Sequence, residues 1–204
     1  MKRNLALLTF VLAVGSSALA APQTFDFKDP KSVNNAVFKL DAPLEAINGS
    51  ANGITGTVEF DPENPANTKG KIVVTANTLQ VPNPIMKGHL HGEQWLNVEK
   101  FPEITFETTS VKNAKNEAGT TTVEVTGNFT LKGVTKELTV PVKLTYLKDK
   151  LAARTNGQMK GDLLVIRANF SIKRSDFNLN PAAPQDKVAD TIDLTLSIAG
   201  ACAK

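Results

Sequence analysis

Apolar and polar residues alternate along most of the chain beyond residue 21. Residues 54–60 read Ile-Thr-Gly-Thr-Val-Glu-Phe, and a similar two-residue period recurs at residues 103–107, 122–131, 134–146, 164–172 and 188–198. Because successive side chains of a β-strand point to opposite faces, this period predicts strands that each bury one face. Turn-forming pairs separate the runs, and two N-terminal strands around residues 25–40 bring the expected number to eight or nine. The sequence therefore predicts an all-β, antiparallel protein.

Strands with a single apolar face must close into a barrel or stack on a second sheet. A closed barrel of eight strands is just wide enough to be filled by side chains or to hold one small ligand. The polar faces carry mainly Thr, Glu, Lys and Asn, and the chain has 10 Phe, one Trp and one Tyr. A transmembrane barrel needs an apolar outer face with aromatic girdles, so we expect a protein that does not span the membrane. A sandwich stays open as the alternative to a barrel.

The first twenty residues have the pattern of a secretory signal peptide. A basic pair at residues 2–3 precedes an apolar run at residues 5–14, and Ala18-Leu19-Ala20 offers a small-x-small cleavage site. The apolar run is too short to cross a bilayer as a helix. We expect cleavage after Ala20, one domain formed by residues 21–204, and a periplasmic or secreted location.

Composition narrows the range of partners. Cys202 is the single cysteine, so the chain cannot form an internal disulfide, while a disulfide between two copies, and a homodimer, stay open. Lys and Arg number 23 against 20 Asp and Glu, which gives a net charge of +3. A nucleic-acid-binding domain would show a clustered basic patch, so nucleic acid is not an expected partner.

The apolar strand faces would line the inside of a barrel with Val, Ile, Leu and Phe. Four positions on these faces are small: Gly56, Ala76, Gly127 and Ala168. Small residues there either leave room for a ligand or allow a tight bend at a bulge. Nothing ionic recurs on these faces, so a hollow core would favour a long apolar ligand, with about 0.8 kcal/mol from each buried CH₂. A packed core without a cavity is the other interpretation.

Residues 81–97 lack a clean period and are expected to form an irregular or short helical segment near one end of the barrel. His89 and His91 lie there, with Glu93 beyond them. A catalytic zinc needs three protein ligands, so a nearby glutamate would have to join the histidines. A hydrogen bond from His89 to a local loop is the simpler interpretation. We expect no metal, no cofactor and no catalytic residue. A metal- or acid/base-dependent enzyme using His89, His91 and Glu93 is kept as an alternative function.

Arg174, Ser175 and Asp176 form a short polar motif at the end of a predicted strand. Arg174 would either pair with a carboxylate and fix a turn, or attract the phosphate or carboxylate head group of a ligand. Ser175 lacks a Gly-x-Ser-x-Gly context, so a nucleophilic triad is not supported.

Four stretches of the sequence resemble the YceI family. They are residues 56–65 (GTVEFDPENP), 87–106 (KGHLHGEQWLNVEKFPEITF), 127–144 (GNFTLKGVTKELTVPVKL) and 173–198 (KRSDFNLNPAAPQDKVADTIDLTLSI). They stand in the family's order and are spread between residues 56 and 198. The resemblance implies an antiparallel, eight-stranded, lipocalin-like β-barrel, commonly exported. It also implies a long hydrophobic lumen that binds a polyisoprenoid, such as a prenyl quinone or a prenyl-phosphate-like lipid, and no established catalytic activity.

Three positions depart from the family pattern. Lys31-Ser32 replaces a His-Ser pair, Lys87-Gly88 stands where an Asp is common before the His-Leu, and Asn178 replaces a Gly. These changes fall in predicted loops or at the mouth, so they bear on the head group of the ligand and leave the fold expectation unchanged.

We therefore expect a lipid-binding protein that sequesters or transports a polyisoprenoid or a similar long-chain lipid; a ligand-free envelope stress protein is a further alternative. The head group is expected near Lys87, His89 and Arg174. The predicted lumen residues are Phe38, Ile54, Val58, Phe60, Val74, Met86, Leu90, Trp95, Phe106, Val125, Phe129, Leu138, Val140, Phe170, Phe177 and Leu194.

Overall fold

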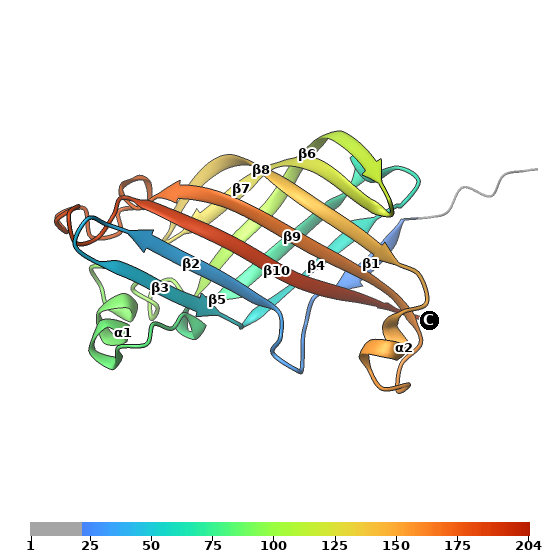
Figure 1. The fold of residues 1–204 in the computed structure, drawn as a ribbon, viewed down its shortest axis with the longest axis horizontal. Coiled ribbons are helices and arrows are strands. Elements are labelled where there is room, and N and C mark those ends of the chain that lie inside the picture. The colour runs from blue at the N-terminus through green and yellow to red at the C-terminus, as the bar shows by residue number, and fades with distance from the viewer. Residues whose placement is uncertain (1–21) are drawn as a thin grey trace, which may run out of the picture.

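The computed structural model describes residues 22–204, so the predicted signal peptide lies outside the described residues. Strands make up most of this part of the chain (Figure 1). The strands are β1 (Gln23–Asp26), β2 (Asn35–Asp41), β3 (Ala46–Ala51), β4 (Ile54–Phe60), β5 (Lys69–Thr75), β6 (Glu103–Glu117), β7 (Thr120–Leu131), β8 (Val134–Leu147), β9 (Gly161–Lys173) and β10 (Thr191–Ala203). The helices are α1 (Pro84–His91) and α2 (Leu151–Arg154), with single 3₁₀ turns η1 (Pro65–Asn67), η2 (Ala76–Thr78) and η3 (Ser175–Phe177).

All strand pairings are antiparallel, and the sheet closes on itself. From β4 to β10 each strand pairs with the next one in the chain. Strands β1 and β2 pair with successive stretches of the same edge of β10, and with β4 and β3 respectively. Strands β1 and β2 thus act as one interrupted strand, and β3 and β4 as another. The result is a closed antiparallel barrel of eight strands. The barrel prediction is confirmed, and the sandwich alternative is wrong.

The alternation of the sequence becomes the inside and outside of this barrel. In β7 every second side chain from Thr121 to Leu131 is buried, while those between them are exposed or half-buried. Figure 1 shows α1 at one end of the barrel and α2 at the other, with the start of β1 and the C-terminus both at the α2 end. No helix among residues 22–204 is long and apolar enough to cross a membrane.

The segment at residues 81–97 forms a short helix followed by turns, as predicted. Helix α1 begins after Asn83, whose side-chain oxygen accepts hydrogen bonds from the N–H groups of Ile85 (2.9 Å) and Met86 (3.1 Å). Pro84 occupies the first turn, where a backbone N–H has no partner within the helix, so the missing N–H of proline costs no hydrogen bond. The helix ends at Gly92, whose N–H donates back to the carbonyls of the last turn.

The four small positions on the inward faces have different roles. Gly56 has a φ of +125°, and a Cβ there would clash with the Lys71 carbonyl of β5, so this glycine permits close strand approach. A Cβ on Gly127 would lie 2.7 Å from the ring of Phe106, so this glycine makes room for an aromatic ring. Ala76 is buried in η2, and Ala168 lines a cavity. One of the four therefore leaves open space in the core.

Cys202 lies in β10 opposite Asp162 of β9 and packs against the core in a half-buried position. An intermolecular disulfide and a homodimer stay predictions.

Candidate ligand-binding lumen

The barrel encloses a cavity of about 220 Å³, called the lumen cavity below. Among the residues that the structure describes, its lining holds no ionisable side chain; four threonines are its most polar members. The lining residues are Ala36, Val37, Phe38, Leu40, Ala51, Val58, Thr68, Gly70, Ile72, Val74, Leu79, Leu90, Trp95, Leu96, Ile104, Thr105, Phe106, Thr108, Val125, Phe129, Leu131, Val140, Val142, Leu144, Ile166, Ala168, Phe170, Ile172, Leu179, Ile192, Leu194, Thr195 and Leu196. A polar molecule in this cavity would have polar groups of its own without hydrogen-bond partners, so the surface suits an apolar molecule.

Most of the predicted lumen residues border this cavity. These are Phe38, Val58, Val74, Leu90, Trp95, Phe106, Val125, Phe129, Val140, Phe170 and Leu194. Five others pack in the core away from the cavity: Ile54, Phe60, Met86, Leu138 and Phe177. A role in ligand binding stays a prediction for all of them.

Sequence reasoning missed two groups of lining residues. Ile72, Val142 and Ile166 were marked by the same alternation as the predicted set, so the signal was present. Leu179 comes from the loop after η3, where no period exists. Its burial depends on how that loop folds over the end of the barrel, which local pattern does not encode.

Trp95 separates the lumen cavity from a second pocket at the α1 end. This outer pocket is open to solvent and is lined by Glu45, Gly88, His89, Gly92, Glu93, Gln94, Trp95, Asn180, Ala182, Ala183, Pro184, Lys187 and Val188. Within residues 22–204, Trp95 alone lines both spaces. The indole ring therefore borders both the lumen cavity and the outer pocket.

Arg174 holds the loop that closes the α1 end. The residue is 1% exposed, and its guanidinium donates to the carbonyl oxygens of Leu179 (2.7 Å), Asn180 and Ala183 (3.2 Å). The same group lies 5.7 Å from the ring centre of Trp95, in a cation–π arrangement. The donors of this guanidinium are used by backbone carbonyls, and the predicted contact of Arg174 with a head group stays a prediction.

The carboxylates near Arg174 have other partners. Asp190 accepts hydrogen bonds from the N–H (2.8 Å) and hydroxyl (2.9 Å) of Ser175. Burial raises the pKa of Asp190, but these bonds and the nearby Arg174 charge outweigh it and lower the pKa overall. Asp176 lies 4.0 Å from Lys136 across an exposed ion pair. The turn is thus fixed by Ser175 and Asp190 rather than by a pair between Arg174 and Asp176.

The histidines of α1 have separate environments. His89 is exposed and lines the outer pocket, while Lys87, half-buried on the same helix, lines neither space. His91 Nε2 lies 2.8 Å from the carbonyl oxygen of Leu79, so His91 makes the loop contact that was expected of His89. No group of three His, Cys, Asp or Glu side chains among residues 22–204 is arranged to hold a metal ion.

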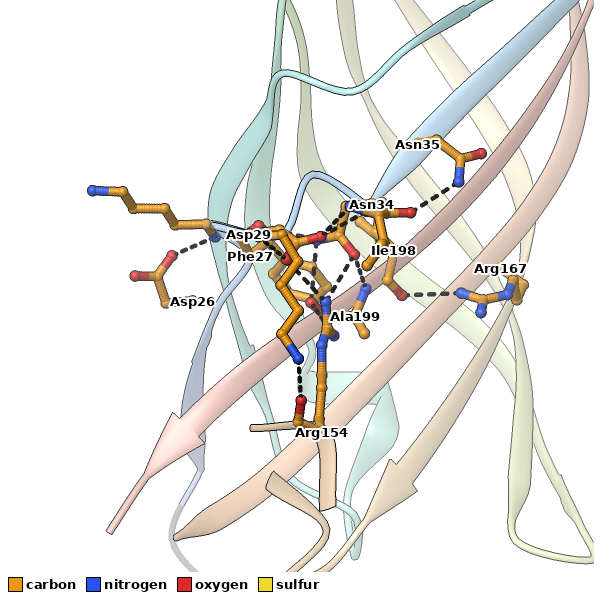
Figure 2. Close-up of polar contacts among 12 residues, drawn as sticks. Asp26, Phe27, Asp29, Asn34, Asn35, Arg154, Arg167, Ile198 and Ala199 are labelled. Atoms are coloured by element: carbon orange, nitrogen blue, oxygen red, sulfur yellow. Dashed lines mark hydrogen bonds and ion pairs between the residues drawn. The ribbon is translucent and has the colours of Figure 1, made fainter. Parts of the chain in front are cut away.

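A polar network joins the chain segments at the α2 end (Figure 2). Asp29 accepts hydrogen bonds from the N–H groups of Val33 (2.8 Å) and Asn34 (2.7 Å), and its carboxylate lies 3.4 Å from the guanidinium of Arg154 in α2. Arg154 also donates to the carbonyl of Ala199 in β10 at 3.0 Å. The linker between β1 and β2 is thereby tied to both α2 and β10.

Aromatic rings fill the barrel beneath this network. Phe25, Phe60 and Tyr146 lie with ring centres 6.2 to 6.5 Å apart. The Tyr146 hydroxyl donates to the fully buried Asp162 at 2.8 Å, and Lys204 Nζ lies 2.9 Å from the same carboxylate. Burial raises the pKa of Asp162, but hydrogen bonds from Asp149, Lys204 and Tyr146 outweigh it and lower the pKa overall. The lumen is therefore closed by a packed layer at the α2 end.

The sequence of this chain is similar to a known domain family and to proteins of other organisms. The model of the YceI-like domain matches residues 28–199. A UPF0312 protein of Yersinia pestis is 38% identical over 156 residues, which cover 74% of this chain and 72% of the relative. A UPF0312 protein of Yersinia enterocolitica is 38% identical over 160 residues, covering 76% and 74%.

Solved structures share the fold at low identity. BcnA of Burkholderia cenocepacia has a TM-score of 0.63 at 19% identity, covering 81% of this chain and 94% of its own. The YceI protein of Campylobacter jejuni has a TM-score of 0.62 at 21% identity, covering 75% and 83%. A polyisoprenoid-binding domain from Saccharophagus degradans has a TM-score of 0.63 at 8% identity, covering 89% and 99%.

Proposed function

Since this chain belongs to the YceI-like family, we propose that its barrel binds a long apolar lipid of the polyisoprenoid class and sequesters or transports it. The observation that carries the proposal is the lumen cavity, which is closed at one end and lined by aliphatic and aromatic side chains. The fold shared with the polyisoprenoid-binding domain from Saccharophagus degradans supports it. A binding protein needs no catalytic group, and the lumen offers hydrophobic surface instead.

The size of the lumen cavity sets how such a lipid would sit. A cavity of about 150 Å³ binds one benzene molecule in an engineered protein core, so 220 Å³ accommodates about two isoprene units. A longer chain must therefore displace lining side chains or extend past Trp95 into the outer pocket. We expect the tail in the lumen and the head group at the α1 end, because the α2 end is packed.

The N-terminal pattern supports a place for this function outside the cytoplasm. With cleavage after Ala20, the protein would hold a lipid tail in the periplasm or in the medium, where a free polyisoprenoid is insoluble. A comparison of the full-length sequence with a variant in which the apolar run at residues 5–14 carries charges would test export. Export predicts that the first reaches the periplasmic fraction in shortened form and the second stays unprocessed.

Lipid extraction tests the binding function directly. The protein is purified without detergent, extracted with organic solvent, and the extract is analysed by mass spectrometry. Trp95 is the single tryptophan, so its fluorescence reports an added prenyl quinone at the boundary of the lumen cavity. Co-purified polyisoprenoid together with a saturable fluorescence change is the expected result. An empty protein that also fails to bind the added quinone overturns the proposal.

A matched pair of variants separates lumen binding from surface adhesion. Ala168→Phe places a ring into the lumen cavity, and Lys143→Phe adds the same ring to an exposed position on the adjacent strand β8. Val142, the neighbour of Lys143, pairs with Ala168, so the two sites are close and differ in the face that they occupy. We expect Ala168→Phe to lose bound lipid and Lys143→Phe to retain it.

A further inference from the structure

The outer pocket carries more acidic than basic charge. Glu45 and Glu93 line it, and its basic side chains among the described residues are Lys187 and His89. Two carboxylates and one ammonium group therefore line the pocket together with the histidine. An anionic head group in this pocket would meet a surface of its own sign.

Two other cations near the pocket are used by the protein itself. The guanidinium of Arg174 donates to backbone carbonyls of the loop at residues 179–189. Lys132 Nζ donates to the carbonyl oxygens of Gln94 (2.9 Å) and Asn178 (3.0 Å). All five N–H donors of Arg174 are used, so holding a phosphate with this guanidinium would require breaking some of these bonds. Lys132 uses two of its three N–H donors in the same way.

Helix α1 adds to the negative character of the pocket. Gly88, His89 and Gly92 line it; the first two lie in the second half of the helix, and Gly92 directly follows it. The carbonyls of residues 88–91 accept backbone N–H groups from Gly92, Leu96 and Val98. The aligned peptide dipoles still give this end of the helix a partial negative charge, which attracts cations and repels anions. The opposite end of a helix, its N-terminus, is the end suited to bind anions.

We propose that the outer pocket is a head-group site that selects uncharged polar head groups, of the quinone or alcohol type, over prenyl phosphates. The inference rests on the proposed function, since it assumes a tail in the lumen cavity beyond Trp95. A carbonyl or hydroxyl head group accepts hydrogen bonds from Lys187, His89 or the Gln94 amide without a charge to desolvate. A phosphate monoester carries about −1.5 to −2 charges at neutral pH, and these would face Glu45 and Glu93.

Two probes with the same tail test the selection. Geranylgeraniol and geranylgeranyl phosphate share one apolar chain and differ in head-group charge. Titrated against the full protein at low salt, the alcohol is expected to bind about tenfold tighter than the phosphate. Raising the salt from 0.05 to 0.5 M, which shortens the Debye length, should narrow this ratio by improving phosphate binding.

A double variant assigns the selection to the outer pocket. Glu45→Gln with Glu93→Gln removes both carboxylates, so the phosphate should gain affinity about tenfold while the alcohol stays unchanged. Glu137→Gln, at an exposed position of β8 that lines neither space, is the matched control and should leave the ratio unchanged.

The outcomes separate this inference from the function on which it rests. Equal or tighter binding of the phosphate by the unchanged protein overturns the head-group selection and leaves lipid binding intact. A ratio that the double variant does not alter overturns the assignment to the outer pocket. Failure to bind either probe overturns the proposed function itself.

Discussion

The side chain of Asn34 pairs with the backbone of Ala199 in the way that a neighbouring strand would. Its amide oxygen accepts the Ala199 N–H at 2.9 Å, and its amide nitrogen donates to the Ala199 carbonyl at 3.2 Å. The pair lies where β10 has lost its partner β2 and has not yet met β1. The amide side chain of Asn34 therefore supplies the hydrogen bonds that the backbone of β10 lacks between β2 and β1 (Figure 2).

Replacing Asn34 should remove the hydrogen bonds that its side chain makes to the N–H and carbonyl of Ala199. Asn34 is 2% exposed, and Asn34→Ala removes these two bonds, a third from the amide nitrogen to the Phe27 carbonyl (3.1 Å), and a longer fourth from the Arg154 guanidinium to the amide oxygen (3.5 Å). Buried groups without partners cost about 1–3 kcal/mol each, so we expect a loss of about 3 kcal/mol in the free energy of unfolding. Urea denaturation measures it. Asn35→Ala, which removes one bond to the Val33 carbonyl, is the control and should cost under about 1 kcal/mol.

Acid should weaken the α2 end through Asp29. Burial raises the pKa of this carboxyl, but backbone N–H groups of Asn34, Lys31 and Val33 and the charge of Arg154 outweigh it, so the pKa lies below 3.8. A lowered folded-state pKa stabilises the fold above the unfolded value, and this contribution disappears as pH falls through the folded value. The free energy of unfolding should thus fall below about pH 4.

Asp29→Asn is the variant that isolates this effect. It should be less stable than the unchanged protein at pH 7 by about 1–2 kcal/mol, and the difference should shrink below pH 3. Urea denaturation at several pH values gives both curves. A difference that stays constant with pH would show that Asp29 does not titrate as described.

Gly127 is expected to resist substitution because of the ring beside it. In Gly127→Ala the new methyl group would lie 2.7 Å from the Phe106 ring and 2.5 Å from the Glu107 carbonyl. Overpacking costs about 1–3 kcal/mol, and the ring can yield only by moving within the lumen lining. We expect lower thermal stability and weaker lipid binding together.

Gly88→Ala is the control for that substitution. Nothing lies within 4 Å of a Cβ on Gly88, which is in the interior of α1. Alanine favours a helix over glycine by about 0.5–1 kcal/mol, so this variant should be slightly more stable. Destabilisation of both variants to the same degree would contradict the role given to the Phe106 ring.

Arg174 should control the order of the loop above the lumen. Arg174→Met keeps much of the side-chain length but removes the guanidinium donors to the carbonyls of Leu179, Ala183 and Ala189, which would then lack this partner in a partly buried site. We expect faster hydrogen exchange across this loop and a loss of about 3 kcal/mol in the free energy of unfolding. Lys173→Met, at the exposed neighbouring position, should change neither quantity.

Alternation in the sequence was enough to predict antiparallel strands that each bury one face, and the family resemblance favoured a closed barrel over a sandwich. It could not predict the interruptions at residues 27–34 and 52–53, since these depend on contacts with distant strands. Residues 27–34 are held by β10 and α2 through Asn34 and Asp29. Neither residue differs in local pattern from an ordinary loop asparagine or aspartate.

The candidate site was predictable where strands form it and much less so where loops do. Val125 and Phe129 line the lumen cavity because they share one face of β7. Arg174 carries a charge at a strand end, which normally indicates exposure. Its burial arises because a loop with no period supplies carbonyls on several sides, and that arrangement exists only in the folded chain.

The packed layer of Phe25, Phe60 and Tyr146 makes the two ends of the barrel different. With one end blocked, a lipid of the proposed kind enters tail first and leaves head first, so every exchange takes place on the face that carries Trp95. Loaded and empty protein would then look alike from the α2 side and differ only at the opposite pole. A receptor, an enzyme or a membrane that accepts the lipid would have to approach that pole, and the tail could pass between hydrophobic surroundings without crossing open water.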